Sequence, residues 1–542
     1  MPTMEVDGQK VSWTGKKMIL QAASEAGVEL PQYCYHPGLS IVASCRICLV
    51  EIESPDPKDP TRLVKLPKLT PSCQTPAVDG MKVYSKSPKA VGNQKAVMEF
   101  LLLNHPLDCP VCDQAGECYL QDYSYKYGNA QSRFEEEKLK NPKKDVGNHI
   151  LLYSDRCILC TRCVRFTREI SGTAELAVFG RGHREEIDVF PGKPVNNPLA
   201  GNVVDICPVG ALLDKDFLFT QRVWFLKSAP SISPISSGGE NIYIHHNEGR
   251  IYRIKPRNNP DVNKWWISDE TRYGFNYVHE NRLAAPEVKQ NAVLTETAWD
   301  MAYAAVDGAL HGAVAAKGPG STACVVSLFD STEEIYLQIK YARSIDPHCW
   351  IILKPAHIAG QDQVFKNPAT GQTTFTIKAE KAPNRKGAEK MLSHFGGNTC
   401  TIAEAATKKI AVALVSADPT LPPDAAARKA AAASIDTIIR LGISPIGLYD
   451  RSTISLPTVS WAEKDGVFEN FEGRIQPFAQ AIAPYADSRS AGRIFWELLG
   501  NTTQYTAASA REQMAAAGLG EYAKVETPVS EVKVEQMQFA EL

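Results

Sequence analysis

Eleven of the fourteen cysteines lie between residues 34 and 207, and they fall into three groups with the close spacing of metal ligands. Each group, completed in one case by a histidine, offers four soft or borderline donors, which is what one metal centre needs. The groups are Cys34, Cys45, Cys48 and Cys73; His105, Cys109, Cys112 and Cys118; and Cys157, Cys160, Cys163 and Cys207. We therefore predict three metal centres.

The composition is that of an ordinary globular protein, with 44% hydrophobic and 22% charged residues. A chain of 542 residues is too long for one hydrophobic core, so several domains are expected. The net charge of −2 gives no electrostatic reason to expect nucleic acid. No apolar run reaches the ~20 residues of a membrane helix and no targeting segment is recognisable, which predicts an intracellular protein. Thiols stay reduced there, so clustered cysteines favour metal over disulfides.

The elements around the first group follow a recognisable order. A hairpin is predicted over residues 4–13, with Asp7-Gly8 at its turn, followed by a helix over residues 19–26 that stops at Gly27. The cysteine loop then leads into a strand at residues 49–53. This order resembles the β-grasp of plant-type [2Fe–2S] ferredoxins. The ten residues between the first two cysteines, instead of four, match a wider-loop variant found in ferredoxin-like modules of large redox enzymes.

Tetrahedral zinc is the alternative for the first group, because four thiolates suit zinc equally well. Zinc ribbons usually pair two Cys-x2-Cys knuckles, and this group has only Cys45-x2-Cys48. Iron–sulfur is therefore the favoured interpretation.

The second group follows an amphipathic helical pattern at residues 89–103, which ends before Pro106. Its three cysteines are one ligand short of a cubane, and His105 is the candidate fourth. The third group has the bacterial-ferredoxin run, with Cys207-Pro208 completing it. In two-cluster ferredoxins the last cysteine ligates the other cluster, which would make His105 surplus. Ligand counting favours His105 in the second centre and Cys207 in the third.

The order of the three groups resembles the large iron–sulfur subunit of NADH:quinone oxidoreductase, the respiratory complex I. The resemblance covers residues 4–490, and the phrase His-Pro-Leu-Asp-Cys-Pro-Val-Cys-Asp-Gln-Ala-Gly-Glu-Cys, at residues 105–118, is highly characteristic. It implies one [2Fe–2S] and two [4Fe–4S] clusters. The chain has no Gly-x-Gly-x-x-Gly dinucleotide loop, so NAD and flavin are expected to bind elsewhere, and no molybdenum is expected. NAD-reducing hydrogenases and some formate dehydrogenases carry a related N-terminal module, so their iron–sulfur chains are alternatives.

Relatives of this kind often hold a further cluster with the spacing Cys-x2-Cys-x3-Cys-x27-Cys. This chain has oxygen-bearing side chains at all four positions, namely Ser233, Ser236, Glu240 and Ser268. A neutral serine is a poor iron–sulfur ligand, so we predict a relic site without a cluster. The alternative is a Ser/Gly-rich linker that aligns by chance.

From about residue 221 the pattern alternates between strand-like and helical stretches, which predicts α/β architecture. Strands are expected at 241–246, 250–254, 323–328, 410–416, 437–439 and 445–448, and helices at 299–310 and 333–344. The phrase at residues 461–476 resembles the molybdopterin-oxidoreductase fold. The lost thiolates, the short domain and the scattered Cys324, Cys349 and Cys400 argue against a molybdenum enzyme, so this half is interpreted as a scaffold without a cofactor.

The predicted fold class is multidomain α+β and α/β. Its domains are a [2Fe–2S] β-grasp domain (1–86), a one-His/three-Cys domain (87–128), a ferredoxin-like domain (145–220), a molybdopterin-oxidoreductase-like scaffold (221–506) and an extension without a core pattern (507–542).

The expected function is electron transfer without catalytic residues of its own. The resemblance implies a path from an NADH-oxidising flavoprotein subunit through iron–sulfur clusters toward quinone-reducing subunits. The implied partners are that flavoprotein, a small 2Fe–2S subunit and the quinone-site subunits of the peripheral arm. The implied location is the cytoplasmic side of a bacterial inner membrane, with membrane contact only through the complex. A zinc-structured scaffold without redox activity is the alternative from another class.

Overall fold

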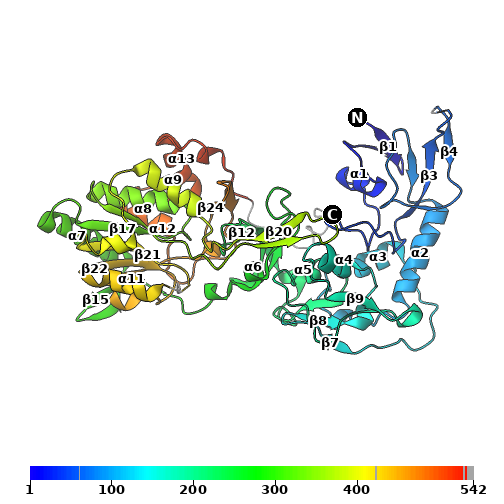
Figure 1. Cartoon of the computed structure of the whole chain (residues 1–542), viewed down its shortest axis with the longest axis horizontal. Helices are drawn as coiled ribbons and strands as arrows, with labels where there is room; N and C mark the ends of the chain where they lie inside the picture. The colour runs from blue at the N-terminus through cyan, green and yellow to red at the C-terminus, as the bar shows by residue number, and fades with distance from the viewer. Residues whose placement is uncertain (60, 421–423, 529–531, 534–542) are drawn as a thin grey trace. The chain divides into compact units, whose positions relative to one another are not determined.

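A computed structural model describes residues 1–59, 61–420, 424–528 and 532–533. The chain divides into two compact units (Figure 1). The first contains Met1–Leu226 and Phe365–Phe375, and the second contains Lys227–Val364 and Thr376–Val532. All three cysteine groups lie in the first unit.

The N-terminal sheet of the first unit is a β-grasp. Its strands, in the spatial order β2-β1-β6-β3-β4, are β2 (Gln9–Ser12), β1 (Thr3–Val6), β6 (Lys82–Tyr84), β3 (Leu49–Pro55) and β4 (Leu63–Lys65), with β5 (Thr70–Pro71) also paired to β3. β1 and β6 run parallel, whereas the other pairs are antiparallel. Asp7 and Gly8 have φ angles of 48° and 87°, as a type I′ hairpin turn requires. The predicted hairpin is confirmed.

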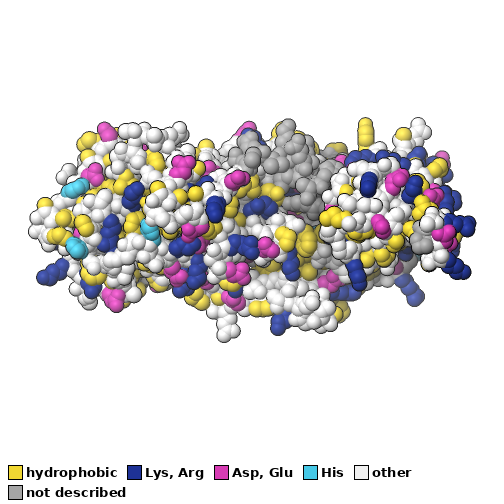
Figure 2. All heavy atoms as spheres, turned by 90° about the horizontal axis from the view of Figure 1, so that it is seen from above, with side chains coloured by type: hydrophobic (Ala, Val, Ile, Leu, Met, Phe, Trp, Pro, Cys, Tyr) yellow, Lys and Arg dark blue, Asp and Glu magenta, His cyan; other side chains and the backbone are white. Residues whose placement is uncertain are grey.

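Helix α1 (Ile19–Glu25) covers this sheet and positions the first cysteine loop. Its Ile19, Ala22 and Ala23 pack in one core with the apolar side chains of β1 and β3. Gly27 ends the helical stretch at φ 74°, as expected. The segment after β3 is basic, with Lys58, Arg62, Lys65 and Lys68 exposed. Figure 2 shows Lys and Arg side chains gathered at this end of the unit.

Helix α2 (Pro88–Leu102) positions the second group. Ser87 Oγ accepts a hydrogen bond from Ala90 N at 3.3 Å, and Pro88 occupies the first turn, where its missing N–H costs nothing. At the other end Lys138 Nζ donates to the carbonyls of Leu102 and Leu103. The helix therefore ends where the sequence predicted. Helix α3 (Tyr119–Tyr127) begins directly after Cys118.

The rest of the first unit holds the third group between short elements. They are the sheet β11-β8-β7, with β11 (Leu212–Asp214), β8 (Ile150–Tyr153) and β7 (Lys143–Asp145); the pair β9 (Leu176–Phe179) and β10 (Glu186–Val189); and the helices α4 (Arg162–Glu169) and α5 (Asn202–Asp205). Three of the cysteines lie between β8 and the first turn of α4, and the fourth follows α5. β11 returns beside β8, which brings the two segments together.

The second unit is built on a seven-stranded sheet. Its order is β16 (Val293–Glu296), β15 (Glu287–Gln290), β23 (Ile454–Pro457), β22 (Thr437–Gly442), β21 (Val412–Ser416), β17 (Thr322–Val326) and β18 (Trp350–Leu353). The five strands from β23 to β18 are parallel. One face packs on α7 (Trp299–Lys317), α8 (Thr332–Ile345), α9 (Arg385–Phe395), α12 (Ala491–Leu498) and α13 (Ala507–Ala516). The other face packs on α10 (Ile402–Ala405) and residues around α11 (Ala425–Ala431).

Smaller elements complete the second unit. They are β12 (Lys227–Ile232), β13 (Asn241–Asn247), β14 (Arg250–Pro256), α6 (Asp269–Tyr273) and the hairpin of β24 (Gly466–Glu469) with β25 (Ile475–Phe478). A further hairpin, β19 (Gln363–Lys366) with β20 (Thr373–Ile377), carries the segment that belongs to the first unit. β13 and β14 form the predicted hairpin, with Glu248 and Gly249 at positive φ.

Two predictions for this half are wrong. Residues 445–448 form a turn instead of a strand, with Gly447 at φ 68°, and the strand beside β22 is β23. Part of the expected C-terminal extension belongs to the core, because α13 buries Met514 and the following turn buries Tyr522. The sequence did not predict this packing because the helix is rich in alanine, and its narrow apolar stripe gives no clear core pattern. The remainder, residues 529–531 and 534–542, lies outside the described residues.

Candidate metal centres

The first group converges in the loop between α1 and β3. Cys34, Cys48 and Cys73 are buried and Cys45 is half-buried. The thiols pair by hydrogen bonds, Cys34 with Cys45 and Cys48 with Cys73. Each bond lowers the pKa of one partner, Cys34 or Cys48, because it stabilises the thiolate. The four predicted ligands therefore gather in one place.

Two non-glycine residues shape the backbone of this loop. Ala43 and Arg46 have φ angles of 51° and 60°, in the left-handed region that side chains rarely adopt. They flank Cys45, so the strain lies where the chain must curl around the thiols. Ser72 N also donates to the carbonyl of Cys48, which ties the distant Cys73 segment to the loop.

The second group lines a cavity of about 620 Å³ that contains His105 and all three cysteines, Cys109, Cys112 and Cys118. Burial lowers the pKa of His105 to about 4, with Arg156 adding to the effect. The imidazole is therefore neutral at physiological pH, which is the form that binds metal. Cys112 and Cys118 are buried, whereas Cys109 is exposed. This centre is closer to the surface than the other two.

Gly210 and Arg156 show how well the second cavity fits a cluster. A Cβ on Gly210 would lie 2.2 Å from Cys112 Sγ, so only glycine leaves this thiol in place. Arg156 Nη1 is buried and has no hydrogen-bond partner among the described residues, although the side chain lines the cavity. Such an atom fits a negatively charged group in the cavity. The donor set, the roomy cavity and the orphan donor together fit a cubane.

The third group lines one small apolar cavity of about 20 Å³, formed with Leu152, Ile187 and other aliphatic side chains. Cys157, Cys160, Cys163 and Cys207 all border it. Leu159 and Thr161, between the cysteines, have φ angles of 51° and 59°. Burial raises the pKa of Cys160 to about 11, and Arg162 counteracts it. Cys207 thus lies with the three cysteines at 157–163, and His105 lies with the second group.

Two buried arginines that the sequence did not single out connect the first and third groups. Arg165 Nη2 donates to the carbonyls of Cys34 and Cys160, one from each group. Arg162 donates to the carbonyls of Tyr35 at 2.5 Å and Ile206 at 3.3 Å. Both lie in the first turn of α4. The Arg-x2-Arg spacing around Cys163 is the signal in the sequence that could have pointed to them.

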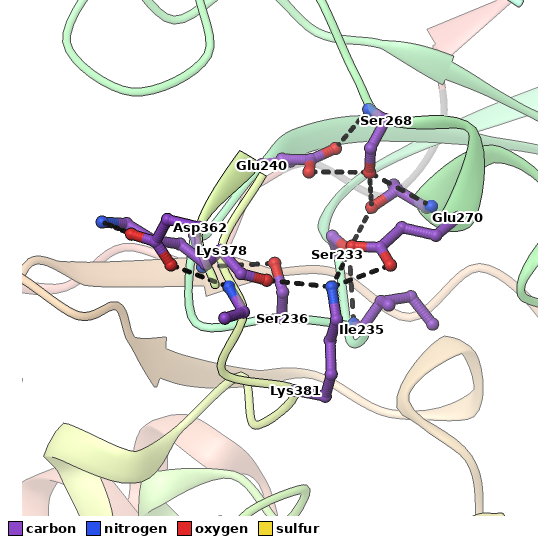
Figure 3. Close-up of polar contacts among 12 residues, drawn as sticks. Ser233, Ile235, Ser236, Glu240, Ser268, Glu270, Asp362, Lys378 and Lys381 are labelled. Carbon is purple, nitrogen blue, oxygen red and sulfur yellow. Dashed lines mark hydrogen bonds and ion pairs between the residues drawn. The ribbon is translucent and has the colours of Figure 1, made fainter. Parts of the chain in front are cut away.

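The predicted relic positions occupy a polar network in the second unit (Figure 3). Ser268 donates to Glu240 through both N and Oγ, at 2.9 Å each. Thr271 Oγ1 lies 3.1 Å from Ser268 Oγ and 2.7 Å from Ser233 Oγ, so it joins three of the four positions. Ser236 stands apart and accepts from Gly238 N. These oxygen donors bond to one another and do not fit an iron–sulfur cluster.

Burial and charge act strongly on this network. Glu240 is almost fully buried, and burial raises its pKa to about 7, because the ionised carboxylate is poorly solvated there. Two lysines stand at its edge, where Lys381 pairs with Glu270 at 2.6 Å and Lys378 with Asp362 at 3.0 Å (Figure 3). The positive charges are thus already paired.

The phrase at residues 461–476 supports the loop that carries these positions. Gln476 Nε2 donates to the carbonyl of Gly239 at 3.0 Å. A Cβ on Gly239 would lie 2.1 Å from Gln476 Oε1 and 2.9 Å from Asn470 Cβ, so the hairpin and the loop demand glycine here. Its φ of 70° adds the same requirement. The phrase therefore has a structural task.

The second unit holds the remaining cysteines apart from these networks. Cys324 and Cys349 are buried on neighbouring strands or their ends, and Cys400 is half-buried. None of the helices in the described part of the chain combines the length and apolar character needed to cross a bilayer.

Family models match five parts of the chain. They are the "2Fe-2S iron-sulfur cluster binding domain" (2–88), the "NADH-ubiquinone oxidoreductase-G iron-sulfur binding region" (94–133), the "NADH-quinone oxidoreductase subunit 3, ferredoxin-like domain" (147–213), the "NADH-ubiquinone oxidoreductase NDSU1/NuoG-like, 4Fe-4S domain" (226–276) and "Molybdopterin oxidoreductase" (380–501). Three of them coincide with the three ligand groups in order.

Similar proteins carry the names of NADH-ubiquinone oxidoreductase and NADH dehydrogenase subunits. The chain is 43% identical over 56% of its length to 42% of the NADH-ubiquinone oxidoreductase 75 kDa subunit of Reclinomonas americana. It is 43% identical over 56% of its length to 40% of the mitochondrial NADH dehydrogenase [ubiquinone] iron-sulfur protein 1 of Solanum tuberosum. These matches support the predicted resemblance to the large iron–sulfur subunits of NADH:quinone oxidoreductases. The predicted fold class is confirmed.

The matched region spans less than half the length of these relatives. A solved NAD⁺-reducing [NiFe]-hydrogenase chain also resembles 41% of this chain and 91% of its own, at 29% identity, with a TM-score of 0.35. Such a score carries no argument about the fold.

Proposed function

We propose that this chain is an electron-transfer subunit of an NADH:quinone oxidoreductase. It would take electrons from an NADH-oxidising flavoprotein subunit and pass them, through bound iron–sulfur clusters, toward quinone-reducing subunits. The observation that carries this proposal is the gathering of three four-ligand sets in one unit, each within its own family match. The resemblance to this family adds the reaction class.

The proposed ligands follow the three groups. Cys34, Cys45, Cys48 and Cys73 would hold a [2Fe–2S] cluster; His105, Cys109, Cys112 and Cys118 a [4Fe–4S] cluster; and Cys157, Cys160, Cys163 and Cys207 another [4Fe–4S] cluster. When bound, these groups supply one-electron carriers. The chain itself buries most of the cysteine ligands, surrounds the third site with aliphatic side chains and places buried arginine beside each group.

We further propose that no fourth cluster, molybdenum, flavin or NAD binds to this chain. The support is chemical: at the 226–276 match, Ser233, Glu240 and Ser268 offer hydroxyls and a carboxyl that are satisfied within one network. Neutral hydroxyls compete poorly with thiolates for iron–sulfur iron.

The partners follow from the family. The proposed ones are the flavoprotein, the small 2Fe–2S subunit and the quinone-site subunits of the peripheral arm, with the chain on the cytoplasmic side of a bacterial inner membrane and no nucleic acid bound. The second unit would serve as a scaffold. A chain ending near Gly210 should still bind the flavoprotein while losing the other peripheral-arm subunits, and undisturbed assembly would argue against the scaffold role.

Anaerobic metal and sulfide analysis of the full chain, with EPR during a redox titration, tests the proposal. One [2Fe–2S] and two [4Fe–4S] clusters require about 10 irons per chain and three signals. About 14 irons would place a further cubane in the chain, and zinc in place of iron would rule out electron transfer.

The other redox functions have their own tests. Bound molybdenum with formate-dependent dye reduction would indicate a formate dehydrogenase chain. Co-purification with a nickel–iron subunit would indicate a chain of an NAD-reducing hydrogenase.

A further inference from the structure

Arg156 is a buried cation whose backbone and side chain serve different centres. Its backbone precedes Cys157, a member of the third group. Its guanidinium, in contrast, lines the cavity of the second group, and the residue is only 2% exposed. The charged group of Arg156 thus lies at a different centre from the one whose ligand it precedes in the sequence.

Three contacts hold the guanidinium in place. Nε and Nη2 donate to Asp108 Oδ2 at 3.1 and 2.7 Å, and the group lies over the Tyr153 ring at 4.0 Å. Nη1 remains without a hydrogen-bond partner among the described residues. The Gly210 Cβ position lies 3.9 Å from Nη1 and 2.2 Å from Cys112 Sγ, so a side chain there would intrude between the two. A buried N–H donor without an acceptor is costly, which argues for an acceptor in the cavity.

The other charges around the cavity are placed differently. They are Asp108, Glu136 and Lys138. Lys138 caps the carbonyls at the end of α2, and Glu136 is exposed. Asp108 is about a third exposed and partly neutralises Arg156. Arg156 is therefore the buried cation of this cavity.

We propose that Arg156 donates its free Nη1–H to the iron–sulfur group held by His105, Cys109, Cys112 and Cys118, and that its charge raises the reduction potential of that group. The inference rests on the proposed function. Adding an electron makes the group more negative, so a buried cation stabilises the reduced form more than the oxidised form. Asp108 acts with the opposite sign, because its carboxylate offsets part of that charge. Arg156 is a positioning and tuning residue.

The test compares four variants of the full chain by iron analysis and EPR-monitored redox titration. Arg156→Gln removes the charge and should lower the reduced-to-oxidised ratio of the histidine-ligated centre about tenfold at a fixed ambient potential, which is about 59 mV for one electron. Arg156→Lys keeps the positive charge but loses the planar guanidinium, so it should lower the reduction potential of this centre less than Arg156→Gln does. Asp108→Asn should raise the reduction potential. Arg133→Gln, an exposed arginine paired with Glu99, is the matched control and should change nothing.

Opposite shifts for Arg156→Gln and Asp108→Asn, confined to this centre, would support the proposal, because a merely structural role would not produce opposite signs. Unchanged potentials, or a shift confined to the Cys157–Cys207 centre, would overturn it. If Arg156→Gln loses the centre, Asp108→Asn decides: an upward shift supports the proposal and no shift overturns it. Absence of the centre from the wild-type chain would instead contradict the proposed function.

Discussion

Single atoms decide whether the second ligand set can form. A Cβ at Gly210 would meet both Cys112 Sγ at 2.2 Å and Gln114 Cβ at 3.1 Å. Because the Cys112 side chain has only one torsion with which to move away, Gly210→Ala should displace the thiol and lose the histidine-ligated cluster. Iron should fall from about 10 to about 6 per chain, with the other two EPR signals kept. Gly92→Ala, on an open face of α2, is the control and should keep all the iron.

Glu240 makes a pH prediction at the same scale. Its folded-state pKa of about 7 lies above the ordinary 4.5, so between these pH values the unfolded carboxyl ionises while the folded one stays neutral. Stability contributed by the neutral carboxyl is complete below pH 4.5 and is lost as the pH rises toward 7, by about 3 kcal/mol at most. Glu240→Gln mimics the neutral form. In denaturant unfolding, its free energy of unfolding relative to that of the wild type should therefore rise between about pH 5 and pH 8. Parallel pH profiles would contradict the expectation.

The residues that sequence reasoning found and missed differ in a physical way. Metal ligands recur at short, fixed spacings in loops, so the sequence alone predicts Cys157, Cys160 and Cys163 as ligands. Arg156 and Gly210 act through contacts with residues far along the chain, which no local pattern encodes. The spacing predicted the four relic positions. It did not predict that Ser236 accepts a hydrogen bond within its own turn, apart from the other three.

At the scale of elements, α8 and α13 are joined by a buried ion pair. Arg511 Nη1 lies 2.7 Å from Glu333 Oε1, and both side chains are almost fully buried. Arg511→Ala would leave the Glu333 carboxylate buried and unpaired, so it should destabilise the second unit by about 3 kcal/mol or more. The double variant Glu333→Gln/Arg511→Met, which removes both charges, should recover much of this loss in thermal unfolding. An additive loss in the double variant would mean that the pair is not coupled.

Sequence patterns predicted the elements that have strong local signals. They failed where strand pairing with distant residues decides which segment forms a strand. The helix predicted at 333–344 has a capping box, Ser331 with Glu334, that fixes its start. Residues 445–448 and 454–457 are both short apolar runs with a proline, and periodicity cannot rank them. Only the second finds partners, β22 on one side and β15 on the other. Arg511 and Glu333 are likewise 178 residues apart in the sequence, so no local pattern predicts their ion pair.

At the scale of the whole molecule, the twelve proposed ligands all lie before Leu226, whereas the fourth family match lies almost wholly beyond it. Phe365–Phe375 also belongs to the first unit, where Thr374 Oγ1 donates to the carbonyl of Ile170 at 2.6 Å. A chain ending at Leu226 loses this contact, so we expect it to unfold more easily.

Its ligands are complete, so the shortened chain should hold about 10 irons, the same as the full chain. The comparison locates iron independently of any partner, because the two chains differ only in residues beyond Leu226. Cys160→Ala in the shortened chain is the control and should remove about four irons, which proves that one lost cubane is detectable. If the full chain instead carries about 14 irons and the shortened one about 10, the Glu240 and Ser268 region holds a cluster despite its oxygen donors. Equal iron in both chains would leave that region as a hydrogen-bonded support.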